Sequence, residues 1–180
     1  MQKIFIYRMF LPILLLVPLV GIFLISAQSA PSTHYDTLQS NPTDIYLKKI
    51  ALSASIFNLI VSLIIYILFD FSTNQFQFVQ EHYNLSYFDV YLGVDGLSIY
   101  FVLLTTIIMP IAIISNWNSI RDNVKSYLII MLLLETLLLA VFLVLDILLF
   151  YIFFESILPP LFLLIPPYYI LHITYYILLQ

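Results

Sequence analysis

The amino-acid sequence predicts an all-α protein, a polytopic bundle of about five transmembrane helices. Of its 180 residues, 63% are hydrophobic and only 9% are charged, whereas soluble globular domains are about 45–50% apolar and about 25% charged. The apolar residues also form stretches of about 20, the length of helix that crosses a hydrocarbon core about 30 Å thick. This composition excludes a water-soluble enzyme, a nucleic-acid-binding protein and a disordered chain. Because no cysteine is present, disulfides and thiolate metal sites are excluded as well.

Polar segments separate the first three predicted spans, which cover about residues 9–27, 50–69 and 97–116. Lys3 and Arg8 precede the first span, but its apolar stretch is longer than that of a signal peptide and further spans follow. Residues 28–49 are predicted to be a polar linker. Residues 70–95 are rich in Phe and Tyr, which favours an interfacial belt or a hairpin on the membrane surface. Asp95, within the sequence GVDG, is predicted to cap the third span.

The last apolar region is too long for a single span. Residues 126–165 are almost unbroken in their hydrophobicity, and as one helix they would measure about 60 Å, or two membrane thicknesses. Tilting cannot accommodate that length. The sequence therefore predicts two spans, about 126–143 and 147–165, joined by a tight turn near Leu143–Asp146.

The basic residues predict an orientation in the membrane. If the spans alternate, four basic residues fall on one side and two on the other: Lys48, Lys49, Arg121 and Lys125 against Lys3 and Arg8. Basic residues in short loops favour the cytoplasmic or matrix side. We therefore expect the group of four on that side and the 70–95 loop on the opposite side.

Glu155 is the strongest candidate for a functional residue. It follows Asp146 by nine residues, about 13.5 Å along a helix, so it is predicted to lie near the middle of the membrane. An ionised carboxylate there costs about 3 kcal/mol to well over 10 kcal/mol, and such acids are typical of proton paths. The alternative is a neutral Glu that hydrogen-bonds a neighbouring helix. Pro159 and Pro160 are predicted to kink or break the helix, which either frees carbonyls that could hold water or simply marks a bend.

Two further acids are weaker candidates for proton sites. Glu135 lies nine residues beyond Ser126, also near mid-depth, and no Lys or Arg lies at that depth to pair with it. Functional and structural roles for Glu135 both remain open. Asp146 lies at the predicted turn and is more typical of a solvated residue or a helix start. The histidines lack metal-ligand spacing and no nucleotide-binding loop is present, so neither a metal nor a cofactor site is predicted.

Two blocks of sequence resemble a known family. Residues 88–117 read FDVYLGVDGLSIYFVLLTTIIMPIAIISNW, and residues 143–165 read LVLDILLFYIFFESILPPLFLLI. The combination of GVDG-[LI]-S, LLTT and FFE-x-x-L-x-P is similar to the chain 4 family of mitochondrial NADH:ubiquinone oxidoreductase, the antiporter-like subunits of respiratory complex I. The resemblance covers residues 1–165, whereas residues 166–180 form a divergent tail.

The resemblance implies a multi-pass protein of the mitochondrial inner membrane that couples electron transfer from NADH to ubiquinone with proton pumping. Its implied partners are the other membrane subunits and the lipid bilayer. NADH, FMN, the iron–sulfur clusters and ubiquinone would be bound by other subunits, which leaves no cofactor in this chain. Glu155 matches a proton-channel residue that pairs with a lysine on the seventh helix, and Asp146 matches an acid at the start of the same helix. No role is implied for Glu135.

The resemblance also implies that this chain corresponds to the N-terminal third of the family's longer subunit. Without the later lysine-bearing helices, the chain alone is not expected to pump protons. Two other functions remain as alternatives: a cation/proton antiporter subunit outside respiration, and a non-catalytic membrane scaffold or assembly protein.

Overall fold

The described residues form five helices and a pair of short strands. The computed structural model describes residues 2–28, 42–72, 76–80, 91–120 and 123–164. The elements in order are α1 (Gln2–Ala27), α2 (Pro42–Leu68), β1 (Gln77–Gln80), β2 (Leu92–Val94), α3 (Ser98–Ser115), α4 (Val124–Leu143) and α5 (Ile147–Leu164). By length and composition each helix can cross a membrane. The predicted polytopic α-helical fold is confirmed. The predicted tail, residues 166–180, and the three histidines lie outside the described residues.

The first two helices begin earlier than the apolar stretches predicted. α1 begins at Gln2 rather than near residue 9, and α2 begins at Pro42 rather than near residue 50. Proline is favourable in the first turn of a helix, and Asp44 in the first turn of α2 complements the helix dipole. The prediction that the polar linker extends to residue 49 is therefore wrong. Hydropathy marks the part of a helix suited to lipid, while capping and hydrogen bonding decide where the helix begins.

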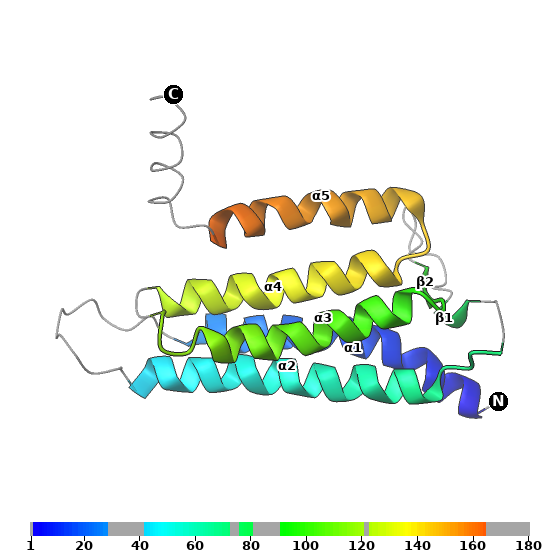
Figure 1. Ribbon diagram of the computed structural model, residues 1–180, viewed down its shortest axis with the longest axis horizontal. Helices are drawn as coiled ribbons and strands as arrows, with labels where there is room; N and C mark the ends of the chain where they lie inside the picture. Colours follow the sequence, from blue (N-terminus) through cyan, green and yellow to red (C-terminus); the bar gives the residue numbers. More distant parts are fainter. Residues whose placement is uncertain (1, 29–41, 73–75, 81–90, 121–122, 165–180) are drawn as a thin grey trace, which may run out of the picture.

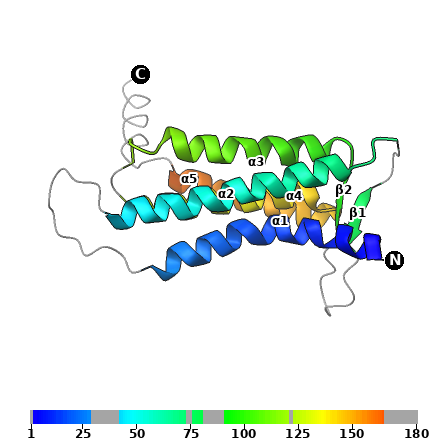
Figure 2. The same ribbon diagram turned by 90° about the horizontal axis from the view of Figure 1, so that it is seen from below.

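The central helix of the bundle is α4, which contacts the other four helices. Figure 1 shows α5 as an outer layer beyond α4, and Figure 2 shows α1, α2 and α3 side by side. Buried residues make up 56% of the α4 span but only 11% of the α5 span. Met131 of α4 packs with Met109 of α3, and Ile157 of α5 lies against the same cluster. Most of α5 therefore presents its side chains away from the described bundle.

A short turn separates the last two helices, as predicted. α4 ends at Leu143 and α5 begins at Ile147. However, α5 continues through Pro159 and Pro160 to Leu164, so of the kink or break predicted at the two prolines the break does not occur, and the kink stays a prediction. The prolines remove the amide hydrogens that would bond the carbonyls four residues earlier. Pro160 is buried and Pro159 is exposed.

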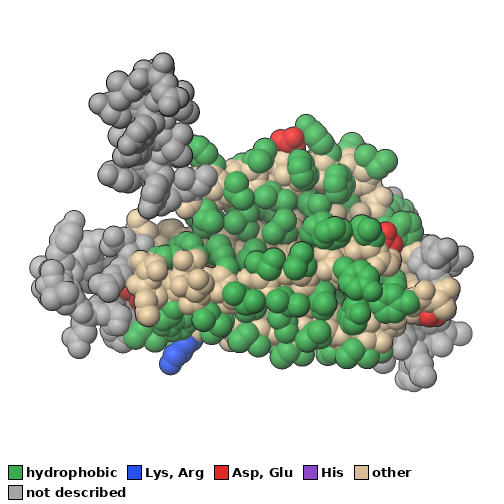
Figure 3. All heavy atoms as spheres, in the orientation of Figure 1, with side chains coloured by type: hydrophobic (Ala, Val, Ile, Leu, Met, Phe, Trp, Pro, Cys, Tyr) green, Lys and Arg blue, Asp and Glu red, His purple; other side chains and the backbone are tan. Residues whose placement is uncertain are grey.

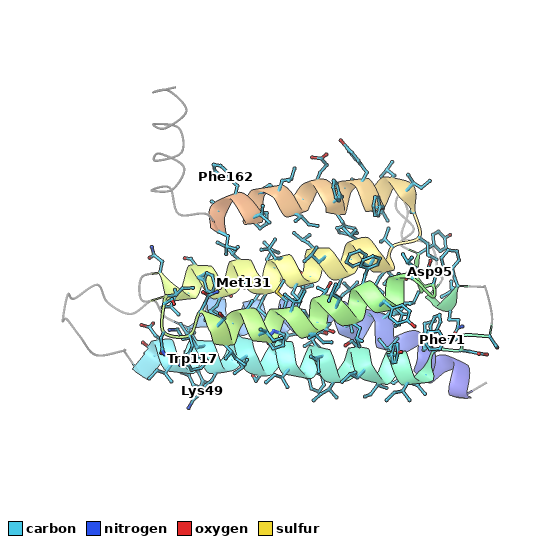
Figure 4. The ribbon with its side chains drawn as sticks, in the orientation of Figure 1. Lys49, Phe71, Asp95, Trp117, Met131 and Phe162 are labelled. Carbon is cyan, nitrogen blue, oxygen red and sulfur yellow. The ribbon has the colours of Figure 1, made fainter. Side chains whose placement is uncertain are left out.

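Two lysines bind helix C-termini at one end of the bundle. Lys48 Nζ donates to the carbonyl oxygens of Trp117 at 2.6 Å and Ile120 at 3.0 Å. Lys125 Nζ donates to Ser26 O at 2.9 Å and Gln28 O at 2.6 Å. Carbonyls that lack partners at a helix C-terminus attract cations. Figure 4 shows Lys49 and Trp117 at this same end, so Lys48, Lys49 and Lys125 share one end of the bundle. The side of the membrane on which this end lies stays a prediction.

A small antiparallel strand pair covers the opposite end. β1 pairs with β2, and β2 reaches the α4–α5 turn through a bridge between Leu92 and Val144. Leu145 N donates to Tyr91 O at 3.0 Å. A Cβ atom on Gly93 would lie only 2.9 Å from Leu145 Cδ1, so glycine permits this close approach. For residues 70–95 the sequence left open an interfacial aromatic belt or a hairpin. The pairing of β1 with β2 favours the hairpin for the described part of this loop.

Asp95 caps the start of α3, as predicted. Its Oδ1 accepts a hydrogen bond from Ser98 N at 2.6 Å, and its own N–H donates to Ser98 Oγ at 2.9 Å. These reciprocal bonds have the form of a capping box. The hydrogen bond from Ser98 lowers the pKa of Asp95 below its usual value. The carboxylate is therefore ionised at neutral pH, and its negative charge stabilises the positive N-terminal end of the helix dipole.

Gly21 allows α1 to pack closely against two other helices. A Cβ atom at Gly21 would lie 3.0 Å from Ala54 Cβ and 3.1 Å from Leu132 Cδ1. Small residues let membrane helices approach in this way. We expect Gly21→Leu to lower the free energy of unfolding by about 2 kcal/mol through overpacking, measured by denaturation in detergent. Val20→Leu, on the exposed face of α1, is the matched control and should change little. Equal stability of both variants would contradict this packing argument.

Candidate functional site

Buried polar side chains lie on three helices, α2, α3 and α4. On α2, Ser55, Asn58 and Ser62 are fully buried, and their spacing of three and then four residues puts them on one helical face. The facing helices contribute the remaining buried polar residues of the described chain: Thr105, Thr106, Glu135 and Thr136. We call these seven residues the polar seam. It runs through a bundle that is otherwise packed with apolar side chains.

Glu135 is held in the polar seam by an amide from α2. Asn58 Nδ2 donates to Glu135 Oε1 at 2.7 Å. Glu135 is 1% exposed and Asn58 is 0% exposed. Among the buried residues that the structure describes, Glu135 is the only ionisable one. The sequence left open that Glu155 hydrogen-bonds a neighbouring helix. The structure shows such a hydrogen bond at Glu135 instead.

Asn58 has an unsatisfied oxygen. Its Oδ1 atom is buried and has no hydrogen-bond partner. More than about 90% of buried polar groups in proteins have a partner, so an exception of this kind needs an explanation. The amide therefore presents an acceptor beside the one buried carboxyl group of the described chain.

Two hydroxyl groups continue the polar seam from this point. Ser62, one helical turn beyond Asn58, lies with its Oγ 2.7 Å from Thr106 Oγ1. Each hydroxyl also reaches a backbone carbonyl one turn earlier on its own helix, Leu59 O for Ser62 and Leu103 O for Thr106. The hydroxyls can both donate and accept. The Ser62–Thr106 pair is thus a second buried polar contact, between α2 and α3.

Glu155 lies in the middle of α5, on its outer face. The α5 residues turned toward α4 include Ile157 and the buried Pro160. Glu155 precedes Ile157 by two positions, about 200° around the helix, and its side chain is exposed. Figure 3 shows an acidic side chain protruding from the apolar surface over α5. The structure does not bring Glu155 and Glu135 together, because Glu135 points into the bundle and Glu155 points out of it.

Asp146 is a helix-start residue, as the sequence indicated. Its side chain is exposed and its Oδ1 accepts a hydrogen bond from Leu148 N at 3.1 Å, while its carbonyl accepts from Phe150 N at 2.9 Å. This arrangement is an N-cap of α5. The geometry thus supports a structural role for Asp146.

A cavity of about 480 Å³ lies between α1 and α2, away from the acids. Its lining is apolar except for one serine: Ile13, Leu16, Val17, Val20, Gly21, Leu24, Ile50, Ser53, Ala54 and Phe57. No ionisable side chain lines it. The cavity therefore contributes no group that could exchange a proton with Glu135 or Glu155.

Sequence reasoning missed Asn58. A single asparagine in a long apolar stretch looks like a tolerated polar residue. The signal that could have found it is the recurrence of Ser55, Asn58 and Ser62 on one face of a helix that is otherwise apolar. Such a face is expected to contact polar side chains inside the bundle, and Glu135 is the acid that Asn58 contacts.

The described residues define a class of protein: a polytopic α-helical membrane protein with a carboxyl group buried among its helices. No family model matches the chain. It is 46% identical over 155 residues to NADH-ubiquinone oxidoreductase chain 4 of Mycosarcoma maydis, covering 86% of this chain and 30% of the relative. It is 38% identical over 162 residues to the chain 4 of Chondrus crispus, covering 88% of this chain and 31% of the relative.

A further relative comes from Podospora anserina. That protein is described as an uncharacterized 50.9 kDa protein in ND4 intron 1; it is 81% identical over 120 residues, covering 67% of this chain and 27% of the relative. The chain therefore belongs to the chain 4 family of NADH-ubiquinone oxidoreductase, as its sequence predicted. The chain spans between about a quarter and a third of the length of these relatives.

Proposed function

We propose that this chain forms part of the proton-translocating membrane arm of respiratory NADH:ubiquinone oxidoreductase, in the mitochondrial inner membrane. There it takes part in coupling electron transfer from NADH to ubiquinone with proton movement. The observation that carries the proposal is the 46% identity over 155 residues to chain 4 of Mycosarcoma maydis. Five helices suited to a membrane, two of them bearing an acid at mid-helix, support it.

In this proposal Glu155 is the principal proton carrier. It occupies the centre of the apolar helix α5 and is exposed toward the side that the described helices leave uncovered. A carboxylate at that depth needs a cationic partner, which the resemblance expects from a lysine on a later helix of the full subunit. Pro159 lies four residues beyond Glu155 and leaves the Glu155 carbonyl without its usual amide donor. That carbonyl is a site where water can bind beside the acid.

Glu135 is proposed as a second group that holds a proton, and Asp146 is assigned to capping α5. Ser62 lies one helical turn beyond Asn58 on α2, and its hydroxyl contacts that of Thr106. Because Glu155 has no cation beside it among the described residues, the described helices alone are not expected to complete a transmembrane relay. The proposed partners are the other membrane subunits and lipid, and the nicotinamide, flavin, iron–sulfur and quinone cofactors belong to other subunits.

A chimera tests the proposal. The matched segment of the Mycosarcoma maydis chain 4 is replaced by residues 1–164 of this chain, and the unmodified relative serves as the control. We expect the chimera to assemble into the respiratory complex and to support ubiquinone-dependent NADH oxidation with proton translocation. Assembly and NADH oxidation without proton translocation would overturn the proposal in favour of a scaffold. Exclusion from the complex together with cation/proton exchange in vesicles would overturn it in favour of an antiporter.

A further inference from the structure

The unsatisfied oxygen of Asn58 points to the chemical state of Glu135. The amide is fully buried, its Nδ2 donates to Glu135 Oε1 at 2.7 Å, and its Oδ1 has no partner. A buried acceptor left without a donor costs free energy, and the cost is larger in an apolar interior than in water. The structure therefore calls for a proton donor at this position.

The neighbouring hydroxyl groups already donate elsewhere. Each buried serine and threonine of the polar seam has a carbonyl acceptor on its own helix within 3.0 Å: Ser55 with Leu52, Ser62 with Leu59, Thr105 with Phe101, Thr106 with Leu103 and Thr136 with Leu133. A hydroxyl has a single proton to donate. The carboxyl group of Glu135 is the remaining buried side chain of the described chain that can supply one.

No charged group of the described chain stabilises an ionised Glu135. From Phe10 onward α1 has no ionisable residue, and β2 has none. The ionisable residues of the other helices that pack with α4, and of α4 itself, lie near the helix ends or are exposed: Asp44, Tyr46, Lys48, Lys49 and Tyr66 on α2, Tyr100 on α3, Lys125 and Tyr127 on α4, and Tyr151 and Glu155 on α5. A buried charge without a partner is strongly unfavourable.

We propose that Glu135 carries its proton in the folded bundle and donates it to Asn58 Oδ1, while Asn58 Nδ2 donates to Glu135 Oε1. The carboxylic acid and the amide then form a closed pair of hydrogen bonds between α4 and α2. This pair satisfies both polar atoms of the Asn58 amide. It holds whether or not the chain takes part in proton pumping.

The pair also makes the contact between α2 and α4 dependent on the proton. An ionised Glu135 accepts hydrogen bonds but cannot donate one. The Asn58 oxygen would then face a negative charge with no donor between them. Asn58 is thus a positioning residue, which senses the protonation state of Glu135 and transmits it to α2.

Infrared spectroscopy on the purified full chain in lipid nanodiscs tests the proposal. We expect a band from a protonated carboxylic acid at neutral pH, shifted to lower frequency in D2O. Glu135→Gln should remove this band, whereas Glu155→Gln, the matched control on an exposed acid, should leave it. Asn58→Leu should retain the band but move it to higher frequency, because the acid loses its hydrogen-bonded partner.

Thermal unfolding over a range of pH provides the second measurement. Glutamine can replace both hydrogen bonds of the protonated acid, so Glu135→Gln is expected to fold and to match the wild-type Tm at acidic pH, where Glu135 is protonated in both the folded and the unfolded chain. The wild-type Tm should fall relative to that of Glu135→Gln as the pH rises, because the unfolded chain gives up the Glu135 proton to water while the folded bundle retains it. A spectrum that Glu135→Gln leaves unchanged, or no such band in the wild type, would show an ionised Glu135 and overturn the proposal. A band that Asn58→Leu leaves at the same frequency would show that the acid hydrogen-bonds a group other than Asn58, such as a bound water, and would overturn it too.

Discussion

Replacing Glu155 by glutamine is expected to lower proton translocation by about 100-fold in a complex whose chain 4 contains this sequence, because positioned proton transfer contributes at least about that factor. Glutamine preserves the size and polarity of the side chain but cannot bind and release a proton in the physiological range. Glu155 lies at the centre of α5 with its carboxylate exposed on the outer face, so the substitution disturbs little packing. The loss should therefore reflect chemistry rather than folding.

The measurement is proton uptake into vesicles, followed by a pH-sensitive dye during NADH oxidation. Glu135→Gln is the comparison variant and is expected to have a milder effect, because glutamine can reproduce both hydrogen bonds with Asn58. Near-normal pumping by Glu155→Gln would contradict the role assigned to Glu155. Equal losses in both variants would show that the two acids are ranked wrongly.

Replacing Glu135 by alanine is expected to lower the free energy of unfolding by about 3 kcal/mol. The substitution leaves the buried Asn58 amide without the side-chain partner that it has among the described residues, which costs about 1–3 kcal/mol. It also opens a cavity at a position that is 1% exposed, and truncation of a large buried side chain to alanine costs about 2–5 kcal/mol. Relaxation of the bundle around the site lowers the total loss of free energy below the sum of these two costs.

Reversible denaturation of the purified chain in detergent measures this loss. Glu155→Ala is the matched control, because it removes the same side chain from an exposed position on α5. It should change the free energy of unfolding by no more than about 0.5 kcal/mol. If the two alanine variants were equally stable, the hydrogen bond between α2 and α4 would contribute nothing measurable to the fold.

Several features of the fold could be predicted from the sequence because they depend on local properties. The apolar stretches predicted five helices, the excessive length of residues 126–165 predicted the turn before Ile147, and the GVDG sequence predicted the cap at Asp95. Each of these depends on residues close together in the chain. The early start of α2 was missed, because a helix can extend into polar sequence where an acid in its first turn complements the helix dipole and the lysine contacts at Trp117 and Ile120 support it.

The sequence by itself determined how far along its helix each acid lies, and so its depth in a membrane. Only the tertiary structure decided which way each acid points. Glu135 and Glu155 occupy similar depths, yet one meets Asn58 inside the bundle and the other is exposed on α5. Rise per residue sets depth in any helix, whereas the facing direction of a side chain depends on which helices pack around it. In an almost uniformly apolar chain, hydrophobicity does not distinguish the faces that meet lipid from those that meet another helix.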